Sequence, residues 1–178
     1  MPQPTRIPKK SGRGNREQGI QIRATTPSDS EEIRHFTREK WADEFVVAHG
    51  VIYYPEQLPG FILKDEKGSI RGLATYRLNP PECELVTLNA DPPGEGIGTA
   101  LVSAVVDIAK KAKCTRLWLI TSNDNLNALA FYQKRGFHLF AIHRDAIEAS
   151  RKLKPSIPLT TADGIPLRDE IELEMILD

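Results

Sequence analysis

The sequence predicts an α/β (α+β) fold, in which a mixed, mostly antiparallel sheet of six to seven strands is flanked by about four helices. Three observations predict this architecture. Short alternating or β-branched segments are typical of strands, a turn signal near the middle indicates a hairpin, and helical patterns separate several of the later strands. Helices must bury their apolar stripes against the sheet, so a layered arrangement follows. The 178 residues fit one domain, which we expect to cover 20–178.

The N-terminal part predicts a strand followed by helices. Residues 20–25 alternate apolar and polar side chains, as a half-buried strand does. Small polar residues and two acids at 27–32 mark a helix start, and the helix continues to about Lys40. We expect a second helix at 41–50, ending at Gly50, and a loop at 51–60.

The rest of the chain predicts a hairpin and then alternating strands and helices. The turn at 65–68 joins strands expected at 61–64 and 69–79. The further expected elements are strands at 82–90, 115–121, 137–143 and 169–177, and helices at 96–112, about 123–136 and 146–154.

Charge and composition argue against several classes of protein. The 24 basic and 24 acidic residues cancel, so no overall field selects nucleic acid or an anionic membrane. Residues 1–19 hold five basic residues against one acid, and we expect a disordered, solvated basic tail rather than a nucleic-acid-binding arm. Two cysteines do not make a disulfide scaffold. No apolar run approaches the ~18 residues of a membrane span, and no secretory signal precedes the domain, so we expect a cytoplasmic protein.

A glycine-rich turn lies between the strand at 82–90 and the helix at 96–112. Gly94, Gly96 and Gly98 let the backbone approach a ligand, and the free N–H groups of the helix start attract an anion. The spacing fails the G-x-G-x-x-G pattern of dinucleotide-binding turns, and no G-K-[ST] of a P-loop is present. A phosphate or pyrophosphate ligand is favoured, although a ligand-free structural turn would explain this motif alone.

A second motif, NLNALAFYQKRGF, covers residues 125–137. At about 100° per residue, Asn125 and Tyr132 would lie about 20° apart around a helix and about 10.5 Å apart along it. One helix face would then offer an amide and a phenol to an elongated ligand. The alternative is that the aromatic residues are core residues, and for Phe131 we favour that interpretation.

Together the two motifs resemble those of the GNAT superfamily of N-acetyltransferases, over about 20–177. The first family pattern is [RQ]-x-x-G-x-[GA] between a strand and a helix, and Gly96-Ile97-Gly98 match it. Pro93 departs from it, since the family prefers Arg or Gln there. The second pattern is N-x-x-A-x-x-[FL]-Y-x-x-x-G-F, which the sequence matches at Asn125, Ala128, Phe131, Tyr132, Gly136 and Phe137.

The resemblance implies an acetyltransferase of EC class 2.3.1. Such an enzyme moves an acetyl group from acetyl-CoA to a primary amine by direct attack in a ternary complex, and it releases coenzyme A. Tyr132 would protonate the leaving thiolate, and a backbone N–H near Leu88 or Asn89 would stabilise the oxyanion. The implied cofactor-binding residues are Leu88, Asn89, Ala90, Gly94, Glu95, Gly96, Ile97, Gly98, Thr99, Ala100, Asn125 and Tyr132. The alternative is a non-catalytic acyl-CoA-binding or regulatory module, which Pro93 favours.

The general base is expected on the strand at 82–90. By alternation Glu82, Glu84, Val86 and Leu88 share one face. Glu82 corresponds to the catalytic glutamate of the histone-acetylating branch of the family, and we predict that Glu82 or Glu84 is the base. The alternative is that both are solvated strand residues. The four histidines are scattered in the sequence, and we expect no metal site.

The resemblance places the acceptor between 41–61 and 144–168. The acceptor is an unidentified small molecule or protein, and a homodimer is left open. The first region suits a cationic amine, with Trp41, Asp43, Glu44, Tyr53, Tyr54 and Glu56. The second region suits an acidic group, with Arg151, Lys152 and Lys154. The two signals conflict, and the sequence does not choose between them.

Overall fold

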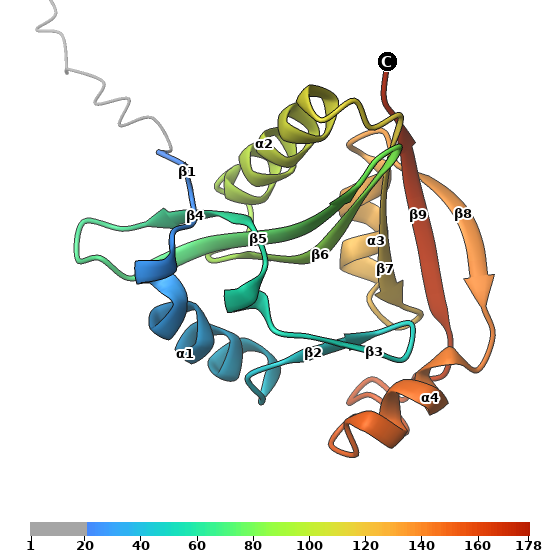
Figure 1. Cartoon of the computed structure of the whole chain (residues 1–178). Helices are drawn as coiled ribbons and strands as arrows, with labels where there is room; N and C mark the ends of the chain where they lie inside the picture. Colours follow the sequence, from blue (N-terminus) through green and yellow to red (C-terminus); the bar gives the residue numbers. More distant parts are fainter. Residues whose placement is uncertain (1–20) are drawn as a thin grey trace, which may run out of the picture.

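A computed structural model describes residues 21–178, so the basic tail expected at 1–19 lies outside the described residues. Its centre is a seven-stranded sheet in the order β1-β4-β5-β6-β7-β9-β8, in which only β6 and β7 are parallel (Figure 1). The predicted mixed, mostly antiparallel sheet is therefore confirmed. Its strands are β1 (Arg23–Ala24), β4 (Gly60–Lys64), β5 (Ile70–Asn79), β6 (Glu82–Ala90), β7 (Arg116–Ser122), β8 (His138–His143) and β9 (Glu170–Ile176).

The helices cover both faces of the sheet. They are α1 (Ser30–Trp41), α2 (Ile97–Lys111), α3 (Leu126–Gln133) and α4 (Ala146–Leu153). The larger hydrophobic cluster joins α2 and α3 to the sheet, with Leu101, Val105 and Leu117 fully buried. A smaller cluster packs Ile33 and Phe36 of α1 against the other face. Within residues 21–178, no helix combines the length and apolarity that a membrane span requires.

The expected helix at 41–50 is wrong, because a small hairpin takes its place. α1 ends at Trp41, and β2 (Val46–Ala48) pairs with β3 (Val51–Tyr53). His49 and Gly50 form the turn with φ of 50° and 65°. Two successive positive φ values suit the tight turn of a two-residue hairpin, and β-branched residues on both sides favour strands.

The strand β6 contains an extra residue. On β5, Thr75 pairs with Thr87 and Tyr76 pairs with Leu85, so Val86 forms a bulge. A bulge reverses the alternation of side chains beyond it. The expected shared face of Glu82, Glu84, Val86 and Leu88 is therefore wrong, because Leu88 packs against the same cluster as Leu85.

The parallel pairing of β6 and β7 is short. It covers only Glu82–Glu84 against Arg116–Trp118. Beyond these residues the two strands are no longer paired, and β7 continues its antiparallel pairing with β9 up to Ser122. The sheet therefore opens between the C-terminal halves of β6 and β7, and the cavities of the candidate site lie at this opening.

Candidate active site

A cavity of about 840 Å³ lies between the end of β6, the glycine turn, the start of α2 and one side of α3. The structure brings most of the predicted cofactor-binding residues together around it. Glu95 and Ala100 do not line the cavity, whereas the other predicted residues do: Leu88, Asn89, Ala90, Gly94, Gly96, Ile97, Gly98, Thr99, Asn125 and Tyr132. The end of β6 and the glycine turn that follows it therefore share one cavity with α3, which lies about 30 residues farther along the chain.

The glycines of the turn have specific geometric reasons. Gly94 and Gly96 have φ of 90° and 82°, a region that side chains disfavour. Gly98 packs against α3, where an added Cβ would lie 3.1 Å from the Phe131 ring. The turn thus brings the first N–H groups of α2, which have no partner within the helix, to the cavity.

A cation that the sequence reasoning missed lies beside this turn. The Arg135 guanidinium donates from Nε and Nη2 to the Thr99 hydroxyl, at 2.9 and 2.5 Å. Its Nη1 donates to the Phe131 carbonyl at 2.7 Å. Arg135 and Lys134 both line the cavity, together with Pro93. The signal available in the sequence was the Lys-Arg pair inside the second motif, at positions where the family pattern accepts any residue.

Asn125 and Tyr132 occupy the two ends of α3. Asn125 precedes the helix, and its Oδ1 accepts a hydrogen bond from the Ala128 N–H at 3.1 Å. Tyr132 is only 8% exposed and packs edge-to-face against Phe137, with ring centroids 5.4 Å apart. Burial raises the pKa of the Tyr132 phenol, which at neutral pH is protonated as an ordinary tyrosine also is.

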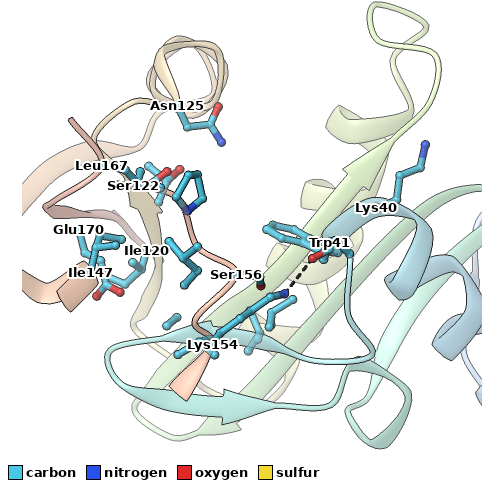
Figure 2. A pocket seen from close by; sticks show the side chains of 18 of the residues that line it. Lys40, Trp41, Ile120, Ser122, Asn125, Ile147, Lys154, Ser156, Leu167 and Glu170 are labelled. Atoms are coloured by element: carbon cyan, nitrogen blue, oxygen red, sulfur yellow. Dashed lines mark hydrogen bonds between the residues drawn. The ribbon is translucent and has the colours of Figure 1, made fainter. Parts of the chain in front are cut away.

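A second cavity, of about 540 Å³, lies beside the first (Figure 2). Val86 of β6 and residues 120–122 of β7 line it, as do parts of α1, the β2–β3 hairpin, α4 and the loop after α4. Asn125 lines both cavities, so the two spaces are neighbours. The opening between β6 and β7 therefore has a cavity at the glycine turn and another toward α1 and α4.

Hydrogen bonds tie the wall of the second cavity to the end of β6. Trp41 Nε1 donates to Asn89 Oδ1 at 3.2 Å, and Lys40 Nζ pairs with Asp91 Oδ2 at 2.8 Å. Lys154 Nζ donates to the Trp41 carbonyl at 2.8 Å. Trp41 therefore bonds to a residue of each cavity.

The two predicted base residues lie outside both cavities. Glu82 Oε1 is 2.9 Å from Nη1 of Arg116. Glu84 is buried, lies 3.3 Å from the Tyr53 hydroxyl and 3.4 Å from Arg77 Nη1, and burial raises the pKa of its carboxyl group. Neither glutamate lines a cavity, so the structure does not bring them together with Tyr132.

Two of the histidines that are scattered in the sequence meet in the fold. The rings of His49 and His143 are 4.8 Å apart, and His143 Nε2 is 2.8 Å from Glu172 Oε2. The Glu172 carboxylate also binds Arg116, which Glu82 and Glu174 share. The histidines are thus part of a charged network across β6, β7, β8 and β9.

Known proteins resemble this chain in sequence and in fold. The family model described as "Acetyltransferase (GNAT) family" matches residues 23–137. The uncharacterized protein YdhI of Bacillus subtilis (strain 168) is 41% identical over 146 residues, which are 82% of this chain and 91% of the relative.

Solved structures share the fold. The IAA acetyltransferase from Bacillus cereus ATCC 14579 superposes with a TM-score of 0.66 and 23% identity, covering 89% of this chain and 100% of that one. A GNAT family acetyltransferase from Elizabethkingia anophelis, solved with acetyl-CoA bound, gives a TM-score of 0.63 and 20% identity, covering 90% and 100% of the two chains. The observed sheet and helices therefore have the architecture of these acetyltransferases.

Proposed function

Because the chain belongs to the GNAT family of acetyltransferases, we propose that it transfers an acetyl group from acetyl-CoA to a primary amine of a small molecule or a protein. The observation that carries this proposal is the 840 Å³ cavity, which the glycine turn, Arg135 and Tyr132 line together. The acetyl-CoA bound to the Elizabethkingia anophelis relative supports the choice of cofactor.

The residues around the glycine turn fit the phosphates of coenzyme A. The N–H groups at the start of α2 attract anions, and Arg135 and Lys134 add positive charge to the same cavity. Pro93 supplies neither an N–H nor a polar side chain, and Arg135 takes over the role of the Arg or Gln that the family prefers at that position. The cofactor supplies the activated acetyl thioester.

The residues at the opening between β6 and β7 carry out the chemical steps of the proposed reaction. A backbone N–H near Leu88 or Asn89, just beyond the Val86 bulge, donates to the oxyanion that develops during attack. The buried Tyr132 phenol donates a proton to the leaving sulfur. The acceptor amine approaches from the 540 Å³ cavity and must lose a proton.

For that proton we retain Glu84 rather than Glu82 as the base. Arg116 pairs with Glu82 at 2.9 Å, whereas Arg77 lies farther from Glu84, at 3.4 Å, and burial raises the pKa of the Glu84 carboxyl group. Because Glu84 lies outside both cavities, ordered water has to relay the proton to it.

Thermal melting tests the cofactor assignment. The protein is melted in parallel with acetyl-CoA, coenzyme A, NAD and ATP. A ligand at 100 times its Kd adds about 2.7 kcal/mol, which shifts the Tm by several degrees. We expect a shift with acetyl-CoA and coenzyme A alone, followed by release of free thiol when an amine panel is added. No shift with either would contradict the proposal, and binding without release from any amine would indicate a non-catalytic module.

A further inference from the structure

The 540 Å³ cavity receives few of the residues that the sequence suggested for acceptor binding. Trp41 and Lys154 line it. Arg151 instead donates to the carbonyl groups of Ile157, Pro158 and Leu167. Lys152 of the same helix is exposed to solvent. Of the three basic residues that the sequence suggested in the region after β8, only Lys154 therefore lines the cavity.

None of the three acidic residues that the sequence suggested in the region after α1 lines the cavity. Glu44 pairs with Arg38, and Glu56 lies 3.5 Å from Arg34. Neither of these glutamates lines the cavity, and Asp43 does not line it either. Of the charged residues that the sequence suggested for acceptor binding, only Lys154 therefore lines the cavity, which favours an acidic group on the acceptor.

Lys154 is a buried cation. Its side chain follows α4 and is 8% exposed. Nζ donates to the Trp41 carbonyl at 2.8 Å (Figure 2) and to the Phe45 carbonyl at 3.3 Å. An ammonium group has three donors, so one donor remains beyond these two bonds, and the Phe45 ring centroid lies 5.3 Å from Nζ. Over the part of the chain that the structure describes, no carboxylate lies within 4.0 Å of this group, and burial lowers its pKa.

The other charged groups of the cavity already have partners. Lys40 pairs with Asp91, and Glu39 lies 3.2 Å from His35. The Glu170 carboxylate accepts hydrogen bonds from the His49 N–H and the Ser150 hydroxyl, both at 3.2 Å. The remaining wall is mainly aliphatic, with Val46, Val86, Ile120, Ile147, Ile157 and Leu167. An anion entering this cavity would find the remaining Lys154 donor in surroundings that strengthen a charged hydrogen bond.

Trp41 also connects Lys154 to the cavity at the glycine turn, where the cofactor is proposed to bind. The Trp41 residue that accepts its hydrogen bond donates from its indole to Asn89, which lines the cofactor cavity. If the anionic group of a ligand binds Lys154, only Trp41 therefore separates it from the end of β6, the strand that would face the thioester. The volume of about 540 Å³ suits a small molecule.

We propose that Lys154 binds a carboxylate of the acceptor, which is a small amine with an apolar skeleton, of the kind found in an apolar amino acid. This proposal rests on the proposed function for the amine. A carboxylate is preferred to a phosphate, because one free ammonium donor satisfies the former better than the latter. The competing role is purely structural, in which Lys154 only binds the carbonyl groups after α1.

Titration calorimetry on the full chain with saturating coenzyme A tests the proposal. The probes form two matched sets: phenylalanine, phenethylamine and 3-phenylpropanoate, and leucine, isoamylamine and 4-methylpentanoate. A charged hydrogen bond contributes about 1.5–3 kcal/mol, so the carboxylate probes should bind about 10- to 100-fold more tightly than the amines that lack it. Lys154→Met should abolish this preference, and Lys154→Arg should retain part of it. Lys152→Met, an exposed change on α4, should leave it intact.

The outcomes separate the two proposals. Equal binding of acid and amine probes by the parent protein, no binding of any probe, or an equal loss of all probes in Lys154→Met would overturn the role of Lys154. If Lys154→Met does not fold, Lys154→Arg decides the matter, because a carboxylate preference that this variant leaves unchanged would overturn the role of Lys154. Acetyl-CoA turnover is measured separately. Lys154-dependent carboxylate binding without thiol release would refute the transferase reaction but keep the binding role.

Discussion

The guanidinium of Arg135 lies over the ring of Phe131, 3.5 Å from its centroid. The same ring approaches Gly98 so closely that a Cβ there would be 3.1 Å away. The packing of α3 on the start of α2 thus fixes Arg135 beside the glycine turn. Phe131, which is predicted to be a core residue, packs against the larger hydrophobic cluster and also lines the cavity at the glycine turn, where it supports the Arg135 guanidinium.

Replacing Arg135 tests the phosphate end of the cavity. Arg135→Gln should raise the Kd of coenzyme A about 10- to 100-fold, because a charged hydrogen bond to the ligand contributes about 1.5–3 kcal/mol. Calorimetry measures the Kd, and melting of the free variant checks folding. Lys110→Gln, on the exposed side of α2, is the control and should bind as the parent does. Unchanged affinity in Arg135→Gln would show that the turn amides suffice.

Replacing Tyr132 tests the proposed acid. Tyr132→Phe should lower kcat about 10²- to 10⁴-fold, the usual contribution of a positioned acid, while the Kd of coenzyme A stays close to that of the parent. The phenyl ring keeps its packing against Phe137, so the fold should persist. Thiol release and calorimetry give the two quantities. Tyr54→Phe, an exposed change, is the control. A variant that turns over at the parent rate would exclude the acid role.

The pH profile tests Glu84. If Glu84 is the base, kcat/KM should rise with pH as its carboxyl group loses a proton, at a pH above the ordinary glutamate range because burial raises its pKa. Glu84→Gln should lower kcat/KM and remove that rise, whereas Glu82→Gln should retain it. An unchanged profile in Glu84→Gln would leave deprotonation to water.

Glu84 also has a predicted effect on stability. Its pKa in the folded state is raised above the unfolded value, so the unfolded state binds fewer protons and the unfolding free energy falls as pH rises between the two values. Glu84→Gln carries no such charge. Its unfolding free energy at pH 7 should therefore equal or exceed that of the parent in urea titrations. A large loss would indicate that the bonds to Tyr53 and Arg77 outweigh desolvation.

Acid unfolding tests Asp29. Arg23 lies 2.6 and 2.8 Å from its two oxygens, and this pairing, with the Thr26 N–H, holds the pKa of Asp29 well below its usual range. A lowered pKa gives stability that is present above the unfolded value and lost as pH falls below about 4. Asp29→Asn should lose about 1–3 kcal/mol at pH 7 and show a flatter acid dependence in urea titrations. Asp163→Asn, in an exposed turn, should change neither.

The local motifs were predictable from the sequence. The bounds of β6 follow from the alternation of side chains, and the start of α2 follows from the glycine-rich turn before it. Both signals are properties of neighbouring residues. The second motif indicated that Asn125 and Tyr132 belong to one site, and both line one cavity, although Asn125 caps α3 from outside the helix and does not share a helix face with Tyr132. These features need no knowledge of the rest of the fold.

The remaining features depend on contacts between distant segments. The Val86 bulge is defined only by its partner strand, so alternation placed Leu88 on the wrong face. The β2–β3 hairpin was mistaken for a helix because ten residues suit either, and only the His49-Gly50 turn distinguishes them. Arg135 and Lys154 gain their positions from Thr99 and Trp41, which are far away in the chain.

The short parallel ladder between β6 and β7 has a kinetic consequence. If the cofactor and the amine occupy the two neighbouring cavities, neither molecule has to leave before the other arrives. Initial rates measured against both substrates should then give intersecting rather than parallel double-reciprocal lines. With each ligand in its own cavity, the acetylated product can also depart while coenzyme A is still bound.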